Sequence, residues 1–214
     1  MKRILFAVCL FALFSSCSSD DEGNSQLQPE SNFYALTVGN SWVYKNYKYN
    51  INTELYEDTG VIDSISIVGT EQLNENTYYK FRRWTTGNEE NIAFCNPNGE
   101  HFELLRDSLG YLVRDNGTVK FTNNDYTERE LRVDTWGTVY EKLVAGETNV
   151  VVESGNFMSI HSERYARDNS SGEQFPGMDR FYYSDGFGLV FDTSSGVVNP
   201  IHVIERRLDS YNIQ

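Results

Sequence analysis

Short runs of alternating apolar and polar residues, separated by turn residues, follow one another along the chain from Phe33 onwards. Alternation with a period of two, filled by aromatic and β-branched residues, favours strands over helices. No stretch of ten residues shows a helical stripe, although 32–38 is compatible with one short helical turn. The pattern predicts about a dozen strands, with candidates at 41–52, 61–70, 77–85, 91–96, 100–106, 110–115, 118–122, 128–133, 138–144, 148–153, 157–167, 180–184, 189–193 and 197–208.

Turn residues between these runs set the expected connections. Segments 96–99 (Asn-Pro-Asn-Gly) and 115–117 (Asp-Asn-Gly) favour tight turns, and 145–147 (Ala-Gly-Glu) is expected to turn between two strands. The longest loop is expected at 168–179. Alternation within the first strand switches face midway, which a bulge near Asn46 explains. So many consecutive hairpins predict an all-β domain with little helix, built on one large curved antiparallel sheet in the form of a half-barrel or barrel.

The first residues follow a different pattern. A basic pair at 2–3 precedes an apolar run at 4–14, which as a helix would cover about half of a bilayer core. Two serines at 15–16 then precede Cys17, and this order is typical of an export signal. It resembles the bacterial lipobox, which implies that 1–16 is a signal peptide and that Cys17 receives a lipid anchor. An ordinary secretory signal with an incidental cysteine is the alternative.

An acidic run follows this cysteine: Ser18, Ser19, Asp20, Asp21 and Glu22. A cysteine followed by serines and acidic residues is similar to the export signal of Bacteroidetes-type lipoproteins on the outer face of the outer membrane. The alternative interpretation is a solvated acidic tether. Segment 17–32 is almost without apolar residues, so we expect a lipidated flexible tether there and a single β-domain at 33–214.

Charge and cysteine content narrow the class of partner. Lys2 and Arg3 leave with the signal, so the mature chain carries 16 basic and 31 acidic residues. Such a surface repels nucleic acid, which is therefore not an expected partner, and the membrane is reached through the lipid. Cys9 also leaves and Cys17 is acylated, so Cys95 is alone and no intramolecular disulfide is expected.

Three segments carry a further resemblance. Residues 33–44 read Phe-Tyr-Ala-Leu-Thr-Val-Gly-Asn-Ser-Trp-Val-Tyr, 154–157 read Ser-Gly-Asn-Phe, and 182–190 read Tyr-Tyr-Ser-Asp-Gly-Phe-Gly-Leu-Val. In order and spacing they resemble motifs of a Bacteroidetes-type family of surface lipoproteins, whose opening is F-x-P-L-x-x-G-N-x-W-V-Y. The resemblance implies a secreted β-domain akin to the half-barrels that carry lipoproteins or lipids, and it implies no activity. Lipocalins are less similar, because their Gly-x-Trp is one residue shorter than the spacing here.

The shared motif positions also have physical interpretations. They are Gly39, Asn40, Trp42, Tyr44, Gly155, Phe157, Gly186 and Gly188. The Gly-Asn pair can supply a positive-φ turn before the first strand, and the Trp and Tyr fall on one face of that strand. The late glycines flank a tight hairpin turn. These roles are structural, and direct ligand contact is the alternative.

The sequence offers few candidate catalytic or metal-binding residues. His101, His161 and His202 lie too far apart in sequence to suggest a metal pair, and no nucleophile elbow, phosphate loop or EF-hand is present, so neither metal nor cofactor is predicted. Cys95 is expected to be buried rather than paired with His101 as a nucleophile. Ser64 and Ser108 lie in Asp-Ser-apolar triplets that resemble the O-glycosylation acceptor of Bacteroidetes-type exported proteins, with coincidence as the alternative.

Aromatic abundance without a catalytic constellation orders the functional hypotheses. The chain has 14 tyrosines and 13 phenylalanines, which can bind ligands, glycans or partner proteins but can also simply fill a core. A non-catalytic binding module at the outer membrane or cell surface is the first hypothesis. A structural or assembly lipoprotein without a small ligand is the second, and a hydrolase is the third. A pocket with convergent polar groups would favour binding, whereas a solid core would favour assembly.

Overall fold

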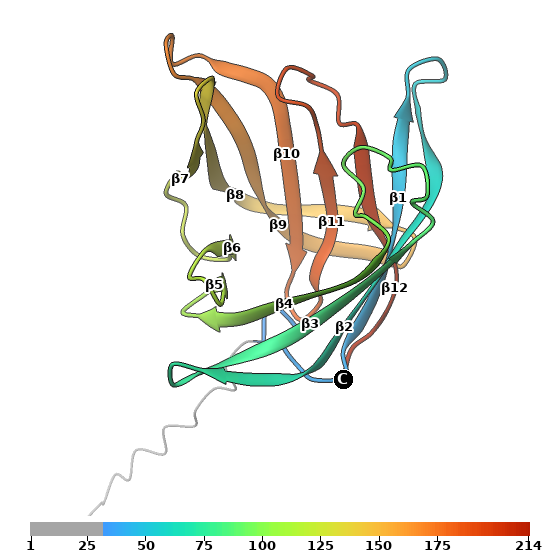
Figure 1. Cartoon of the computed structure of the whole chain (residues 1–214), viewed down its shortest axis with the longest axis vertical. Coiled ribbons are helices and arrows are strands. Elements are labelled where there is room, and N and C mark those ends of the chain that lie inside the picture. Colours follow the sequence, from blue (N-terminus) through green and yellow to red (C-terminus); the bar gives the residue numbers. More distant parts are fainter. Residues whose placement is uncertain (1–31) are drawn as a thin grey trace, which may run out of the picture. The chain divides into compact units, whose positions relative to one another are not determined.

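Twelve strands account for most of residues 32–214, the part of the chain that our computed structural model describes (Figure 1). They are β1 (Ser41–Asn50), β2 (Leu55–Leu73), β3 (Asn76–Thr86), β4 (Gly99–Ser108), β5 (Tyr111–Arg114), β6 (Val119–Thr122), β7 (Arg129–Val133), β8 (Gly137–Val152), β9 (Gly155–Asp168), β10 (Gln174–Ser184), β11 (Gly188–Ser194) and β12 (Ile204–Asn212). This confirms the predicted all-β fold. Segment 32–40 forms turns instead of a helical turn.

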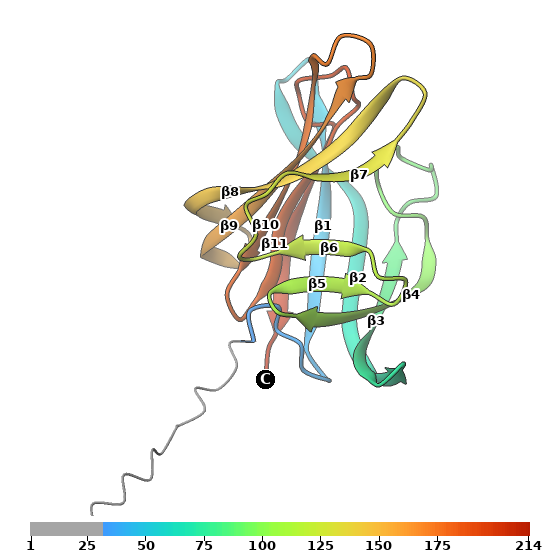
Figure 2. The same cartoon turned by 90° about the vertical axis from the view of Figure 1, so that its left-hand side faces the viewer.

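All twelve strands belong to one antiparallel sheet, in the order β6-β5-β4-β3-β2-β1-β12-β11-β10-β9-β8-β7. Strands β1 and β12 join its two halves, with pairs from Ser41–Asn212 to Lys48–Ile204. The edge strands β6 and β7 are not paired with each other, yet the sheet curls until both lie on one side (Figures 1 and 2). The predicted single curved sheet is thus an open barrel, and we call the space inside its curl the lumen.

The character of the inner face changes along the strands. We call the end of the lumen that holds Tyr34 the base. From the base upwards, the paired inner residues of β1–β3 form the rows Ile67–Phe81, then Trp42–Ile65–Arg83, then Tyr44–Asp63–Thr85. The next row, across β1, β12 and β11, is Asn46–Arg206–Asp192. Apolar side chains therefore fill the base, and charged and amide side chains occupy the rows above it.

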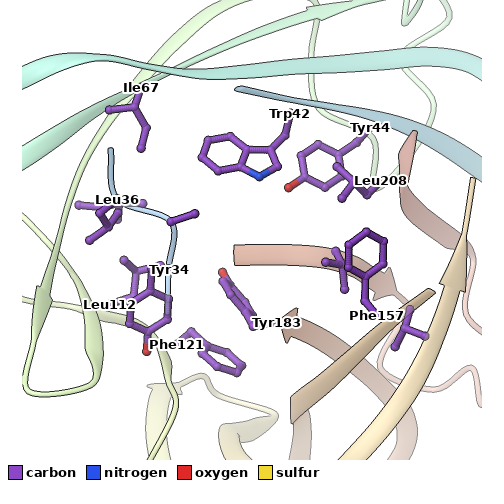
Figure 3. Packing of buried hydrophobic residues seen from close by; sticks show 14 of the residues in the cluster. Tyr34, Leu36, Trp42, Tyr44, Ile67, Leu112, Phe121, Phe157, Tyr183 and Leu208 are labelled. Carbon is purple, nitrogen blue, oxygen red and sulfur yellow. The ribbon is translucent and has the colours of Figure 1, made fainter. Parts of the chain in front are cut away.

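The segment before β1 closes the base of the lumen. Tyr34, Ala35 and Leu36 are all buried. The Tyr34 ring meets the rings of Phe121 and Tyr183 edge to face, with centroids 6.3 and 6.0 Å apart (Figure 3). Its hydroxyl donates to the carbonyl of Gly110, 2.5 Å away. The base is consequently a packed aromatic core and not an opening.

Two irregularities in long strands deserve comparison with the predictions. The register of β1 against β2 shifts between Lys45 and Tyr47, which confirms the bulge expected at Asn46. The prediction of a turn at 145–147 is wrong. Strand β8 is continuous there, and its register against β9 shifts between Val144 and Thr148. Gly146 has φ +95° at this bulge, so a glycine that resembles a turn signal serves a bend within a strand.

Because of that bend, the tip of the β8–β9 hairpin lies against the outside of the sheet. Figure 1 shows it passing behind β11 and β12. The Ser154 amide donates to the Leu208 carbonyl at 3.2 Å, and Arg207 on the outer face of β12 lies 3.5 Å from Glu153. These contacts fix the hairpin tip to the middle of the sheet.

Three predicted segments differ from the structure. Residues 91–96 are loop, because the Asn88 side chain accepts from the Ile92 amide and donates to the Asn96 carbonyl, at 2.7 and 2.8 Å. The loop expected at 168–179 is shorter, since β10 begins at Gln174. Residues 197–203 are loop, and β12 starts only at Ile204. In each case side-chain hydrogen bonds or pairing partners outweigh local propensity.

Candidate ligand-binding lumen

Trp42 and Tyr44 of the opening motif reach across β12. Strand β11 pairs with β12 only from Phe191 to Ser194, so carbonyls nearer its start lack a partner strand on that side. Trp42 Nε1 donates to the Phe187 carbonyl at 2.8 Å, and the Tyr44 hydroxyl donates to the Leu189 carbonyl at 2.7 Å. Both side chains are buried, and burial raises the pKa of Tyr44 well above its ordinary value. This arrangement favours the structural interpretation of the two residues.

The other residues of the opening motif connect the base segment to Gln214. Gly39 has φ +99°, in the region that glycine adopts most readily, as predicted for the turn before β1. Asn40 is fully buried. Its Nδ2 donates to the Ala35 carbonyl at 2.8 Å, and its Oδ1 accepts from the Gln214 amide at 2.9 Å. One asparagine thus anchors both the base segment and the end of the chain.

The central and late motifs meet in a second aromatic cluster. Gly155 starts β9, and Phe157 packs on Phe187 at 5.1 Å and on Tyr211 at 6.0 Å between ring centroids. Gly186 and Gly188, both with φ +74°, flank Phe187 in the hairpin turn between β10 and β11. A Cβ at Gly188 would lie 3.3 Å from the Tyr34 carbonyl oxygen, so the turn is pressed against the base segment. The three motifs, far apart in sequence, form one packed region.

The remaining predicted sites lie elsewhere. Cys17 and the acidic run at 18–22 fall outside the described residues. Ser64 is exposed on β2, and Ser108 is half-buried as the last residue of β4, directly before the turn at Leu109 and Gly110. Cys95 is half-buried in the β3–β4 loop rather than in the core.

A cavity of about 110 Å³ lies in the lumen directly above the packed base. Its walls combine aromatic and aliphatic side chains with charged ones. They are Tyr34, Trp42, Tyr44, Ile65, Phe81, Arg83, His101, Glu103, Leu105, Leu112, Lys120, Tyr183, Gly188, Leu189 and Arg206. Figure 3 shows the Tyr183 hydroxyl directed toward the side of the cluster that carries Trp42 and Tyr44. The sequence motifs contain several of the aromatic residues that line the cavity but none of the charged ones.

Arg206 is the centre of a buried ionic network at the upper wall. Its guanidinium pairs with both oxygens of Asp192, at 2.8 and 3.0 Å, and lies 3.6 Å from Asp63. Asp63 also accepts from Thr85 at 2.5 Å and from Asn96 at 2.9 Å. Burial opposes ionisation of Arg206, but the two carboxylates outweigh it and raise its pKa. Every charged group in this network therefore has an ion-pair partner.

A second ion cluster centres on Glu103 of β4. Glu103 accepts from Lys120 of β6 and from Arg114 Nε of β5, the latter at 2.6 Å. Burial alone would raise the pKa of Glu103, but the two cations lower it. Burial lowers the pKa of Lys120 despite its carboxylate partner. Glu103 is thus held as an ionised acceptor whose oxygens are both occupied.

Arg83 differs from the other cations of the cavity. No ion pair within residues 32–214 includes it, and its Nε is buried without a hydrogen-bond partner. Burial lowers the pKa of Arg83, and the neighbouring Arg206 acts in the same direction. In the sheet it stands beside Ile65 and His101. A cation with a free, buried Nε donor therefore lines the cavity between an isoleucine and a histidine.

The open side of the barrel holds a second, larger cavity of about 490 Å³. Thr118 and Val119 of the β6 side and Leu131 and Arg132 of β7 contribute to its walls. Arg114 lines it as well and donates to Glu103 of the first cavity. The second cavity thus borders the edge strands β6 and β7 (Figure 2), and the Arg114–Glu103 ion pair lies between it and the inner cavity.

The Cys95 thiol is not activated as a nucleophile. Burial raises the pKa of the Cys95 thiol to about 11, so at neutral pH it is protonated and poorly nucleophilic. Within residues 32–214, no three His, Cys, Asp or Glu side chains are grouped to share a metal ion. The same part of the chain contains no helix long and apolar enough to cross a bilayer.

Comparison with known proteins gives a fold and no closer kinship. No family model and no curated protein matches the chain. A solved structure of a predicted lipoprotein from Parabacteroides distasonis matches with a TM-score of 0.52 at 14% identity, covering 86% of this chain and 100% of that one. A predicted exported protein with a YmcC-like fold from Bacteroides fragilis matches with a TM-score of 0.53 at 9% identity, covering 85% and 99%. The likeness is one of fold.

Proposed function

We propose that this chain is an exported lipoprotein whose β-domain is a non-catalytic binding module, with the lumen as its ligand site. The lipobox-like segment at Cys17 supports export and lipidation. Two solved proteins that share the fold carry the names lipoprotein and exported protein, both from Bacteroidetes. The binding role rests on one observation: the inner cavity gathers polar groups on an apolar wall and includes the unpaired Arg83.

The size of the inner cavity favours binding over a purely structural role. A solid lumen would have supported an assembly lipoprotein, and the base is indeed solid. Above it, however, about 110 Å³ remain open. An engineered cavity of roughly 150 Å³ accepts benzene, so this space accommodates a group of about that size. The second cavity, of about 490 Å³, has room for a larger ligand.

The charged groups of the cavity support a non-catalytic role. A general base needs a free lone pair and a pKa near the working pH. Glu103 does not meet the second condition, because Lys120 and Arg114, which each donate to one of its oxygens, lower its pKa. The carboxylates around Arg206 are likewise engaged. These groups fix the shape and charge of the cavity.

A filling substitution tests the ligand site. Phe at Ile65 would occupy the cavity, whereas Ile62→Phe on the same strand but the opposite face leaves it open. We expect small ring compounds such as benzyl alcohol, benzamide and benzoate to shift the NMR methyl signals of Leu105 and Leu112. Ile65→Phe should abolish the shifts and Ile62→Phe should retain them.

Two other results would favour the alternatives. If none of the compounds shifts these methyl signals, the lumen is not a ligand site and the assembly lipoprotein gains. If the protein hydrolyses p-nitrophenyl esters and Ile65→Phe removes that activity, the domain is a hydrolase.

Lipidation has a direct test of its own. Cells fed a clickable fatty acid should label the wild type, and Cys17→Ala should lose both the label and membrane association. Cys95→Ala is the matched control and should remain labelled, because that residue lies within the β-domain. Label that persists on the Cys17→Ala protein would contradict the proposal.

Display at the cell surface depends in this proposal on the acidic run. Replacing Asp20, Asp21 and Glu22 by alanine should keep the lipid but remove the protein from the outer face of the outer membrane. Protease treatment of intact cells measures this. Undiminished cleavage of the variant would reduce the run to a tether.

A further inference from the structure

We infer that the lumen binds an organic monoanion: a carboxylate that pairs with Arg83, carried on a flat apolar body of about one ring. This inference deepens the proposed function and rests on it. Three observations carry it: the charge balance of the cavity, the directions in which its aromatic residues donate, and its volume.

Charge balance singles out one cation. Arg206 is compensated by Asp192 and Asp63, and Lys120 and Arg114 share Glu103. Arg83 has no such partner within the described residues, although the chain carries 31 acidic residues. A buried donor without an acceptor is unfavourable, and a guanidinium matches a carboxylate with two parallel hydrogen bonds. A ligand carboxylate would supply the acceptor that Arg83 lacks within the described residues.

The number of charges on the ligand follows from the sum of the charges around the cavity. Glu103 also lines the cavity and is held ionised by its two cations. The Glu103 cluster has two cations for one carboxylate and the Arg206 network has two carboxylates for one cation, so these excesses cancel and the charge of Arg83 remains. The site is therefore suited to one negative charge.

The aromatic walls define the body of the ligand. Tyr34, Trp42 and Tyr44 all use their polar hydrogens on backbone carbonyls, so these three donors are unavailable to a ligand, and among the aromatic walls only the Tyr183 hydroxyl makes no hydrogen bond within residues 32–214. Trp42 also stacks on Phe81, with centroids 6.1 Å apart and planes within 15°. A sugar would need free donors and acceptors for its hydroxyls, so these walls favour a flat apolar body over a glycan. With about 110 Å³ available, that body is the size of one ring.

The test compares benzoate with benzamide, which have the same shape but differ in charge. The protein is the mature chain 17–214 carrying Cys17→Ala, and NMR titration gives the Kd for each compound. We expect benzoate to bind about tenfold more tightly, as a charged hydrogen-bonded pair typically provides. Benzoate should also shift the Arg83 Nε–H signal, which benzamide should move less.

Variants assign the preference to its residue. Arg83→Gln should bring the two Kd values within about twofold of each other, and Arg83→Lys should keep part of the preference because the charge remains. The matched control is Arg82→Gln, since Arg82 is on the opposite face and pairs with Glu100 at 2.6 Å. It should leave both Kd values unchanged.

Each contrary outcome has a distinct meaning. Equal binding of benzoate and benzamide by the wild type would overturn the monoanion inference and leave the proposed function standing. A preference that survives in Arg83→Gln would overturn the role of Arg83. Absence of binding by both compounds would remove the lumen as a site, and the proposed function would fail with it.

Discussion

The base of the lumen and the rows above it are built on the same strands but solve opposite problems. At the base, Tyr34, Phe121 and Tyr183 pack ring against ring, and the Tyr34 hydroxyl donates to a backbone carbonyl. Above it, charged side chains line space that the protein leaves open. Packing at the base stabilises the domain, and in our proposal the upper rows select the ligand. Single substitutions should separate these two roles.

The largest expected effect is at the base. Trp42→Ala should destabilise the domain by about 3–5 kcal/mol, the usual cost of truncating a buried large aromatic residue. Chemical unfolding of the mature chain measures this. Trp84 is the matched control, because it is 44% exposed on β3 and should cost below about 1 kcal/mol. If Trp42→Ala unfolds like the wild type but loses ligand binding, the structural interpretation of the motif is wrong.

A smaller loss is expected at the turn that touches the base segment. Gly188→Val should cost about 1–3 kcal/mol, because a β-branched residue is strained at φ +74° and its Cβ would crowd the Tyr34 carbonyl. Thermal melts can compare it with Gly69→Val. Gly69 has open space around it and lies in β2, so that variant should melt close to the wild type. Equal losses in both would contradict the proposed strain.

The Glu103 cluster should make stability depend on pH. Its pKa in the folded state lies below the ordinary value of 4.5, because Lys120 and Arg114 outweigh burial. A carboxyl with a lowered pKa stabilises the fold above its ordinary value, and this contribution is lost as the pH falls through the folded value. Glu103→Gln should therefore be less stable than the wild type at about pH 7, and the gap should narrow as the pH falls below 4.5.

Urea unfolding at several pH values measures that gap. Glu100→Gln is a suitable control, because Glu100 forms a half-exposed pair with Arg82 and such pairs contribute little. A gap for Glu103→Gln that is independent of pH would contradict the expected linkage.

The smallest expected effect is at Arg83. Removing a half-buried cation that has no ion-pair partner should leave stability within about 0.5 kcal/mol of the wild type or increase it. Differential scanning calorimetry of Arg83→Met checks this. A loss above about 2 kcal/mol would assign Arg83 to the structural part of the lumen.

Sequence patterns predicted the fold better than the site. Alternation and turn residues identify β-structure because they are local, and the bulge at Asn46 is visible as a change of face. The continuous β8 could not be foreseen, since a glycine bend and a hairpin turn share the residues at 145–147. Arg83 was missed because β3 carries aromatic residues on both faces, so alternation does not say whether Arg82 or Arg83 points inward.

The charged wall had one local signal that could have been used. In β12, Arg206 lies midway between Ile204 and Leu208, so the alternation of the strand places it on the same face as these two buried residues. Its carboxylate partners come from β2 and β11, so only the sheet order explains how the charge is tolerated.

The sheet order also relates this chain to a simpler one. Every pairing joins strands that follow each other in sequence, except that of β1 with β12, and the unpaired edges β6 and β7 are themselves consecutive. The fold is therefore a circular permutation of a plain meander. A chain opened between Thr122 and Arg129 and joined near Ser41 and Asn212 would keep every ladder while making all of them local. Lower contact order predicts that such a permutant folds faster than the natural chain.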